Sequence, residues 1–239
     1  MSVMQKRTVL ISGASRGIGR SIAERLLLDG HRLSLGVRDP KDLLATPLDP
    51  AASPDQLMVH PYEASSSASA TTWVEAATAW AGGFDAVVHC AGVLHRTPLL
   101  FSDEQESDLE ALWSINVRGP WTLTRAAWPH LIASGQGRIQ VLVSMSGKRL
   151  KGRMAGYPVS KFALYGLCQA MRNEGWNYGI RVTALCPSWV NTDMARSVST
   201  MEPAAMTQPQ DLALLSSTLL TLPNAAVPFE LGINCNLEV

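Results

Sequence analysis

The chain has 239 residues and a formal net charge of zero, with 20 basic and 20 acidic side chains. This length is within the range of one α/β domain that can bury a sizeable core, and the balanced charge argues against partners such as nucleic acid or an anionic membrane surface. No apolar run approaches the roughly 18 residues that suggest a membrane span, and residues 1–7 run directly into a strand-like segment, so no signal peptide is expected. These observations predict a cytoplasmic protein without nucleic-acid or membrane partners.

The cysteines lack the spacing of a zinc site, and the histidines are scattered without a metal-like pattern. In a chain without a secretion signal, cysteines are expected to be reduced, small, buried residues. The four residues concerned are Cys90, Cys168, Cys186 and Cys235. No metal site is predicted.

The first unit of the chain is a strand, a glycine-rich turn and a helix. An apolar, β-branched run at residues 8–11 predicts a buried strand, and apolar residues at helical spacing predict a helix over 20–29. Between them, Gly13, Gly17 and Gly19 form the pattern G-x-x-x-G-x-G. Glycines in this context let the backbone approach a pyrophosphate, which then meets the positive end of the helix. The unit predicts a dinucleotide-binding loop.

Strand and helix patterns then alternate to the end of the chain. Further strands are predicted at residues 32–37, 57–59, 85–89, 139–143, 180–185 and 230–235. Helices are predicted at residues 71–81, 103–134, 158–176 and 209–222, with a break in the second near Gly119-Pro120 and a short helix at 42–45. This alternation predicts an α/β fold of the Rossmann type, a doubly wound parallel sheet of about seven strands with helices on both faces. No repeat or linker divides the chain, so residues 1–239 are expected to form one NAD(P)-binding domain.

A tyrosine and a lysine are placed four residues apart in the sequence Tyr157-Pro158-Val159-Ser160-Lys161. On a helix they share one face, so the ammonium can sit beside the phenol and lower its pKa from roughly 10. Because proline is tolerated in the first turn of a helix, Tyr157 is expected at that turn. Such a phenol can exchange a proton with a carbonyl or alcohol oxygen.

Five segments of the chain occur in the order and at the spacing of a known family: residues 12–19, 88–92, 114–117, 143–147 and 186–193. They resemble the motifs of the single-domain branch of the short-chain dehydrogenase/reductase superfamily, and the resemblance covers essentially the whole chain. Two departures stand out. His89 and Cys90 replace two asparagines of the family pattern, and Ser188 replaces a glycine.

The resemblance implies a catalytic set. Tyr157 would be the general acid in reduction and the base in oxidation, and Lys161 would lower its pKa and contact the nicotinamide ribose. Ser144 would donate a hydrogen bond to the substrate oxygen, and Asn116 would hold a water that links Lys161 to solvent. Ser146 is a competing choice for the serine, although its spacing to the following glycine and tyrosine fits the motif less well.

Together with the glycine loop, the resemblance marks a set of cofactor-binding residues, in which Glu63 is placed near the adenine. The set consists of Gly13, Ser15, Arg16, Gly17, Ile18, Gly19, Arg38, Glu63, Ala91, Gly92, Tyr157, Lys161, Pro187, Val190 and Thr192.

The end of the second predicted strand bears on the choice between NADP and NAD. An acidic side chain there binds the ribose hydroxyls, whereas a basic one accommodates a 2′-phosphate. The chain reads Gly36-Val37-Arg38-Asp39, and Arg16 supplies a second guanidinium from the glycine loop. Two arginines can clamp a phosphate by bidentate hydrogen bonds, so NADP(H) is favoured over NAD(H). In the alternative, Asp39 takes the acidic role and Arg38 faces solvent.

The substrate is expected to be a small carbonyl or alcohol compound. Four cations lie between Ser144 and Tyr157, namely Lys148, Arg149, Lys151 and Arg153. They either attract an anionic substrate or form a solvated loop with its charges outward. Residues 194–207 contain three methionines, which suit an adaptable substrate lid but could equally fill the core.

The leading hypothesis is an NADP-dependent carbonyl reductase or secondary-alcohol dehydrogenase. One alternative is a catalytically silent NADP-binding regulator, and another is a sugar-nucleotide epimerase or dehydratase, against which the short C-terminal region argues. The resemblance also implies a homodimer or homotetramer through the helices at 103–134 and 158–176. Four tryptophans on these segments are candidate interface anchors or internal packing residues: Trp113, Trp121, Trp128 and Trp176.

Overall fold

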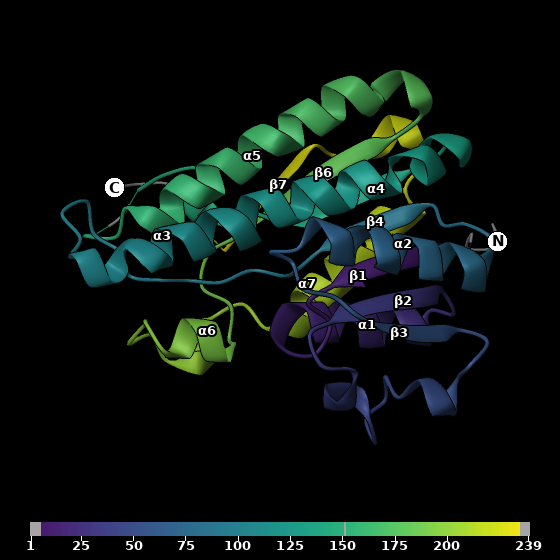
Figure 1. The fold of residues 1–239 in the computed structure, drawn as a ribbon, viewed down its shortest axis with the longest axis horizontal. Coiled ribbons are helices and arrows are strands. Elements are labelled where there is room, and N and C mark those ends of the chain that lie inside the picture. Colours follow the sequence, from purple (N-terminus) through teal and green to yellow (C-terminus); the bar gives the residue numbers. More distant parts are fainter. Residues whose placement is uncertain (1–5, 151, 235–239) are drawn as a thin grey trace.

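The computed structural model describes residues 6–150 and 152–234. Their centre is a seven-stranded sheet in the order β3-β2-β1-β4-β5-β6-β7, with every neighbouring pair parallel (Figure 1). The strands are β1 (Thr8–Ser12), β2 (Arg32–Val37), β3 (Leu57–Pro61), β4 (Ala86–His89), β5 (Arg138–Leu142), β6 (Arg181–Pro187) and β7 (Glu230–Ile233). The predicted Rossmann-type sheet is confirmed, although Cys235, predicted in the last strand, lies outside the described residues.

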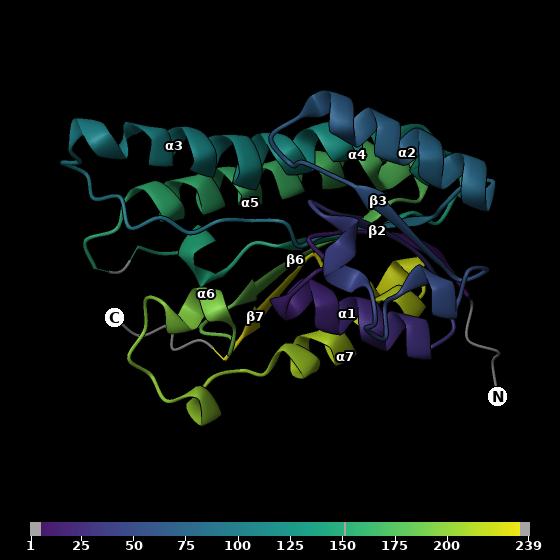
Figure 2. The same ribbon diagram turned by 60° about the horizontal axis from the view of Figure 1, so that its bottom comes forward.

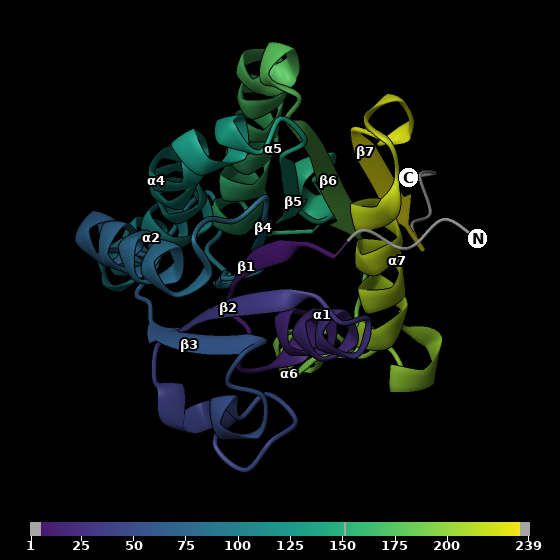
Figure 3. The same cartoon turned by 90° about the vertical axis from the view of Figure 1, so that its right-hand side faces the viewer.

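Helices cover both faces of this sheet. Viewed from the side in Figure 3, α2, α4 and α5 lie against one face, and α1 and α7 lie against the other. The bounds are α1 (Gly17–Leu28), α2 (Ser67–Ala81), α3 (Glu106–Trp113), α4 (Gly119–Ala133), α5 (Gly156–Gly175), α6 (Asp193–Arg196) and α7 (Pro209–Thr221). Each long helix lies within a few residues of its predicted range.

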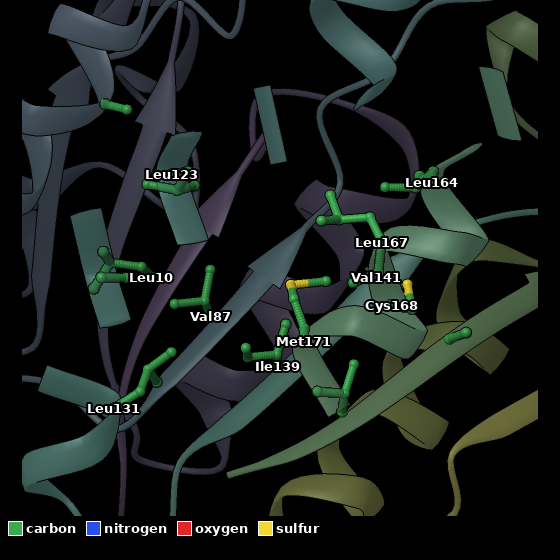
Figure 4. Close-up of a cluster of buried hydrophobic side chains, with 14 of the residues drawn as sticks. Leu10, Val87, Leu123, Leu131, Ile139, Val141, Leu164, Leu167, Cys168 and Met171 are labelled. Carbon is green, nitrogen blue, oxygen red and sulfur yellow. The ribbon is translucent and has the colours of Figure 1, made fainter. Parts of the chain in front are cut away.

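Because helices cover both faces, the strands bury side chains on both sides. One apolar cluster fills the space between the sheet and the layer of α2, α4 and α5, where Leu10, Val87 and Ile139 face residues such as Leu123 and Met171 (Figure 4). A second cluster lies under α1 and α7. These two cores give the sheet a fixed position from which its loops extend.

The structure corrects the predicted break in the second long helix. Gly119 and Pro120 begin α4 without interrupting the helical run, because proline is accommodated in a first turn. The irregularity lies just before them, where residues Ser114–Arg118 form one π-helical turn between α3 and α4. Such turns often mark functional positions. The short helix predicted at 42–45 is a 3₁₀ turn at Pro40–Leu43.

The strand order reverses direction between β1 and β4, because β1, the first strand of the chain, pairs with β2 on one side and with β4 on the other. In sheets of this type, ligands bind beyond the carboxyl ends of the strands at such a switch point. The glycine loop, the turn after β4 and the residues after β5 and β6 all follow carboxyl ends of strands. In Figure 2, α6 lies on the side of the molecule where α5 begins.

Candidate functional site

The glycine loop between β1 and α1 has the geometry of a phosphate cradle. Gly13 and Gly17 have φ values of 71° and 57°, which favour glycine. A Cβ on Gly13 would lie 2.7 Å from the amide nitrogen of Ala91, so a side chain there would displace the neighbouring turn. The first turn of α1 has no side-chain cap, which leaves its N–H groups for an anion. This part of the chain fits the pyrophosphate of a dinucleotide.

The turn after β4 is held by residues other than the two asparagines of the family pattern. The Ser12 hydroxyl accepts hydrogen bonds from the backbone N–H groups of Cys90 at 3.2 Å and Ala91 at 3.3 Å. His89 is buried, with its Nε2 atom 2.9 Å from the Thr124 hydroxyl oxygen. Burial lowers the pKa of His89 to about 3, so the imidazole is neutral. The replaced residues therefore form an ordered turn.

Tyr157 lies in the first turn of α5, as predicted, and is buried. Burial raises the pKa of its phenol to about 12, and a hydrogen bond with the Ser144 side chain lowers it in part. Ser144 has a φ of 105°, which is strained for a residue with a Cβ, and its Oγ also accepts from the Ser146 N–H at 3.1 Å. The serine that contacts the phenol is thus Ser144, and Ser146 supports it through its backbone.

The lowered pKa predicted for Tyr157 is wrong, because burial of the phenol raises its pKa instead. The Lys161 Nζ lies 5.7 Å from the centroid of the Tyr157 ring and donates a hydrogen bond to the Leu142 carbonyl at 2.9 Å. Burial lowers the pKa of Lys161 itself to about 8. The amine is therefore mostly charged near neutral pH.

Asn116 lies in the π-helical turn and connects three segments. Its Oδ1 accepts from the Val93 N–H at 2.9 Å, and its Nδ2 donates to the Val93 carbonyl at 2.9 Å and to the Ser160 hydroxyl at 3.1 Å. A Cβ on Gly92 would lie 3.3 Å from Asn116 Oδ1 and 3.8 Å from Lys161 Nζ. The structure thus brings Asn116, Gly92 and Lys161 to one place, and the water attributed to Asn116 stays a prediction.

Sequence reasoning assigned no role to Ser160. Besides accepting from Asn116, its hydroxyl donates to the Tyr157 carbonyl at 2.7 Å, which fixes the first turn of α5. The available signal was a serine three residues after the tyrosine on the same helix, a spacing at which a hydroxyl can reach the backbone of the preceding turn.

The two arginines considered for the cofactor are exposed, and among the described residues neither guanidinium has a hydrogen-bond or ion-pair partner. Arg38 directly follows β2, and the Gly13 N–H donates to the Gly36 carbonyl at 2.9 Å, so the strand end and the glycine loop are neighbours. Asp39 instead caps the following 3₁₀ turn, accepting from the Lys41 N–H at 2.9 Å.

Glu63 lies in the exposed connection after β3. One carboxylate oxygen accepts from the Ser65 N–H at 3.1 Å and from its hydroxyl at 3.0 Å. Its placement near an adenine stays a prediction.

The segment after β6 lies against the glycine loop. Thr192 caps α6, and its Cγ2 is 3.3 Å from the position of a Cβ on Gly17. Pro187 and Val190 are buried, and Val190 bridges to Thr207 at the far end of the segment. Ser188 does not have a positive φ, so the serine replaces the family's glycine without backbone strain.

The predicted lid methionines divide into two kinds. Met206 is buried, whereas Met194 and Met201 are exposed. The Arg96 guanidinium also donates to the Val198 carbonyl, which connects this segment to the loop after β4.

Residues 6–150 and 152–234 contain no cluster of His, Cys, Asp or Glu side chains suited to a metal ion. Within the same ranges, no helix is long and apolar enough to cross a membrane.

Comparison with known proteins identifies relatives of the whole chain. A family model described as short chain dehydrogenase matches residues 7–203. Agropine synthesis reductase of Rhizobium rhizogenes is 34% identical over 240 residues, which is 100% of this chain but 54% of that protein. A second protein of this name is covered to 52%, so the chain spans about half the length of these relatives. Oxidoreductase UcpA of Salmonella typhimurium is 31% identical, with 97% of this chain and 87% of that protein covered.

Solved structures agree with this grouping. An alcohol dehydrogenase from Thermococcus sibiricus, complexed with 5-hydroxy-NADP, has a TM-score of 0.84 and 27% identity, with 96% of each chain covered. A metagenomic short-chain oxidoreductase in complex with NADP has a TM-score of 0.81 and 26% identity, with 98% of this chain and 99% of that chain covered.

The buried His89 predicts a pH-dependent stability. Its pKa is about 3 in the folded protein and 6.5 in a free side chain, so below pH 6.5 the unfolded chain binds a proton that the folded chain excludes. Stability therefore falls as pH drops through this window. Between pH 7 and pH 5 we expect the free energy of unfolding to fall by about 2 kcal/mol more in the wild type than in His89→Asn.

Urea unfolding followed by tryptophan fluorescence at pH 7, 6 and 5 measures this difference. His31, whose pKa burial also lowers, is present in both proteins and so serves as an internal control. Parallel pH profiles for the two proteins would show that His89 is not held neutral.

Proposed function

The chain belongs to the short chain dehydrogenase family, and on that basis we propose that it is an oxidoreductase that uses NADP(H) to interconvert a carbonyl group and a secondary alcohol. The observation that carries this proposal is the meeting of Ser144, Tyr157, Lys161 and Asn116 beside the glycine loop. We also propose that the single sheet of the described residues works as one dinucleotide-binding domain.

When bound, the cofactor supplies or accepts the hydride. The side chains of this protein orient the substrate, polarise its oxygen and move the proton. With a pKa of about 12, Tyr157 is protonated at neutral pH and suited to give its proton to a carbonyl oxygen during reduction. The Ser144 hydroxyl can donate a hydrogen bond to the same oxygen, which stabilises the negative charge that develops there.

The positive charge of Lys161 favours transfer of the phenolic proton, because the phenolate that remains is next to a cation. Asn116 and Ser160 act on the backbone around this centre, through Val93 and the Tyr157 carbonyl. They fix the position of the loop after β4 relative to the first turn of α5. Tyr157, the proposed proton donor, therefore keeps its position relative to that loop.

The preference for NADP rests on Arg16 and Arg38. Both guanidinium groups are exposed and have no partner among residues 6–150 and 152–234, whereas the Asp39 carboxylate caps a turn. A 2′-phosphate offers these arginines the bidentate geometry that guanidinium groups favour. Two similar structures were solved with NADP or a derivative of it, which agrees with this choice.

We further propose a homodimer or homotetramer that uses the outer face of α3, α4 and α5. Four large apolar side chains are exposed on these neighbouring helices: Trp113 (52%), Trp121 (57%), Val159 (57%) and Phe162 (41%). An exposed apolar surface of this kind is typical of a protein interface. Trp128 instead packs against the core, and Trp176 lies under the guanidinium of Arg181 at 3.7 Å.

Tyr157→Phe tests the catalytic proposal. Loss of the hydroxyl removes the proton donor, and we expect kcat for NADPH-dependent reduction of a responsive carbonyl compound to fall roughly 10²- to 10⁴-fold with unchanged NADPH affinity. Tyr178→Phe, at an exposed position beyond α5, is the matched control and should retain activity. Binding of NADPH without reduction of any member of a broad carbonyl panel would favour the silent regulator.

Arg38→Gln tests the cofactor preference. Loss of a bidentate contact should weaken NADPH binding roughly 10- to 100-fold and leave NADH within about twofold. Quenching of tryptophan fluorescence gives both dissociation constants. Arg25→Gln, in the last turn of α1 and away from the glycine loop, controls for the loss of a surface charge. Tighter binding of NADH by the wild type would assign the ribose to Asp39.

Trp121→Lys tests the assembly. A charge in the centre of an apolar interface is left desolvated, so we expect the mass measured by light scattering to fall by at least half at micromolar concentration. Leu28→Lys, at an exposed position on α1, should leave the mass unchanged. An unchanged mass for Trp121→Lys would place the interface elsewhere.

A further inference from the structure

The segment that connects Ser144 to Tyr157 contains the cations of the basic run, and both of its ends are fixed. The Arg149 N–H donates to the Met145 carbonyl at 3.1 Å, one residue after Ser144. At the other end, the N–H groups of Ala155 and Gly156 donate to the Thr97 carbonyl at 2.8 and 3.0 Å. The segment therefore lies at the carboxyl edge of the sheet, between two residues of the proposed catalytic set.

Lys148 is already paired within the protein. Its Nζ lies 2.8 Å from a Glu230 carboxylate oxygen and 4.0 Å from the centroid of the Tyr165 ring. The Tyr165 hydroxyl donates to the same Glu230 oxygen at 2.5 Å. These contacts lower the pKa of Glu230 and raise that of Lys148, so both remain charged and neutralise each other. Lys148 is a tether for the segment and is not available to a substrate.

Arg149, unlike Lys148, has no ion-pair partner among the described residues. It is half-buried, its Nη1 is fully enclosed, and no acceptor within residues 6–150 and 152–234 pairs with that atom. Arg138, which also has one unpaired nitrogen, donates through its other nitrogens to Gln136, Gly137, Leu222 and Asn224. Enclosing a guanidinium nitrogen without an acceptor costs free energy. The other two guanidinium nitrogens of Arg149 are neither enclosed nor paired within the described residues, which leaves them open to an anionic ligand.

The part of the chain around Arg149 is strongly basic. Between residues 111 and 173 the sequence has nine basic side chains and no acidic one, although the whole chain is neutral. This stretch includes Asn116, Ser144, Tyr157 and Lys161. A surface of one sign attracts and orients ligands of the other sign.

We propose that Arg149 binds an anionic group of the substrate, a carboxylate or a phosphate, and so selects acidic carbonyl compounds over neutral ones. The planar guanidinium matches either group by bidentate hydrogen bonds. Lys148, Glu230 and Tyr165 hold the segment in the position from which Arg149 can act. The proposal rests on the proposed carbonyl reductase activity, because it names the class of substrate for the same site. Lys151 and the remaining basic residue, Arg153, are not required, since Lys151 lies outside the described residues and Arg153 is exposed.

Matched pairs of carbonyl compounds test the proposal: 4-oxopentanoate with its methyl ester, and dihydroxyacetone phosphate with dihydroxyacetone. With NADPH, the wild type should reduce at least one acidic member with the higher kcat/KM. In Arg149→Met, kcat/KM for that acid should fall about 100-fold while the neutral partner stays within about twofold. Arg149→Lys should recover part of the loss, and Arg153→Met should change neither value. The better acidic member identifies the anion as carboxylate or phosphate.

A binding measurement separates this proposal from the proposed activity. Thermal stabilisation of the protein–NADPH complex by at least one of the acidic compounds should be present in the wild type and lost in Arg149→Met, whether or not reduction follows. Stabilisation without turnover would keep the anion site and contradict the reductase. Equal binding or equal turnover of acid and neutral partner would overturn the role of Arg149. A lower oligomeric mass for Arg149→Met would also overturn it, by assigning its counter-ion to a second copy of the chain.

Discussion

The amide group of Asn116 is the contact on which the site depends. It forms hydrogen bonds with both the N–H and the carbonyl of Val93, as the backbone of a paired strand would, and so fixes the loop after β4. Its third hydrogen bond reaches Ser160, whose hydroxyl binds the backbone of Tyr157. One buried side chain therefore connects the π-helical turn, the loop after β4 and the first turn of α5. A buried amide that satisfies all these groups is costly to replace, because each partner would be left unpaired.

Burial controls the chemistry of the charged and titratable groups around this contact. The pKa of Tyr157 is raised, that of Lys161 is lowered, and that of His89 is lowered further, each chiefly because the charged form loses its hydration. The phenol is consequently protonated at neutral pH, and the Lys161 amine is mostly charged there, although its pKa is well below the usual value. Backbone strain is also present there, since Ser144 combines a positive φ with the hydrogen bond to the phenol. The site is held by packing and hydrogen bonds from several elements, which is what allows strain to persist there.

Individual residues show which features of the site could be predicted from the sequence. Gly13, Gly17 and Gly19 predicted the loop correctly, because glycine tolerates the positive φ and the close approach of backbone that such a turn needs. The Tyr157–Lys161 spacing correctly placed both residues on α5, yet the expected effect on the pKa of Tyr157 failed, because burial of the phenol depends on segments distant in sequence. The π-helical turn around Asn116 was likewise missed, because the local signal of a break was Gly119-Pro120, which directly follows that turn. The role of Ser12 in holding the turn after β4 arises from a contact across 78 residues.

The sequence by itself determined the parallel sheet, the glycine loop and the residue types of the proposed catalytic set, because periodicity, glycine spacing and helical geometry are local properties. Only the tertiary structure decided which cations are free to act. Lys148 and Arg149 are adjacent and equivalent in the sequence, but Glu230, which arrives on the last strand, neutralises the first, and no described residue pairs with the enclosed Nη1 of the second. Burial and electrostatic pairing are sums over the neighbours that folding assembles, so a one-dimensional pattern does not contain them.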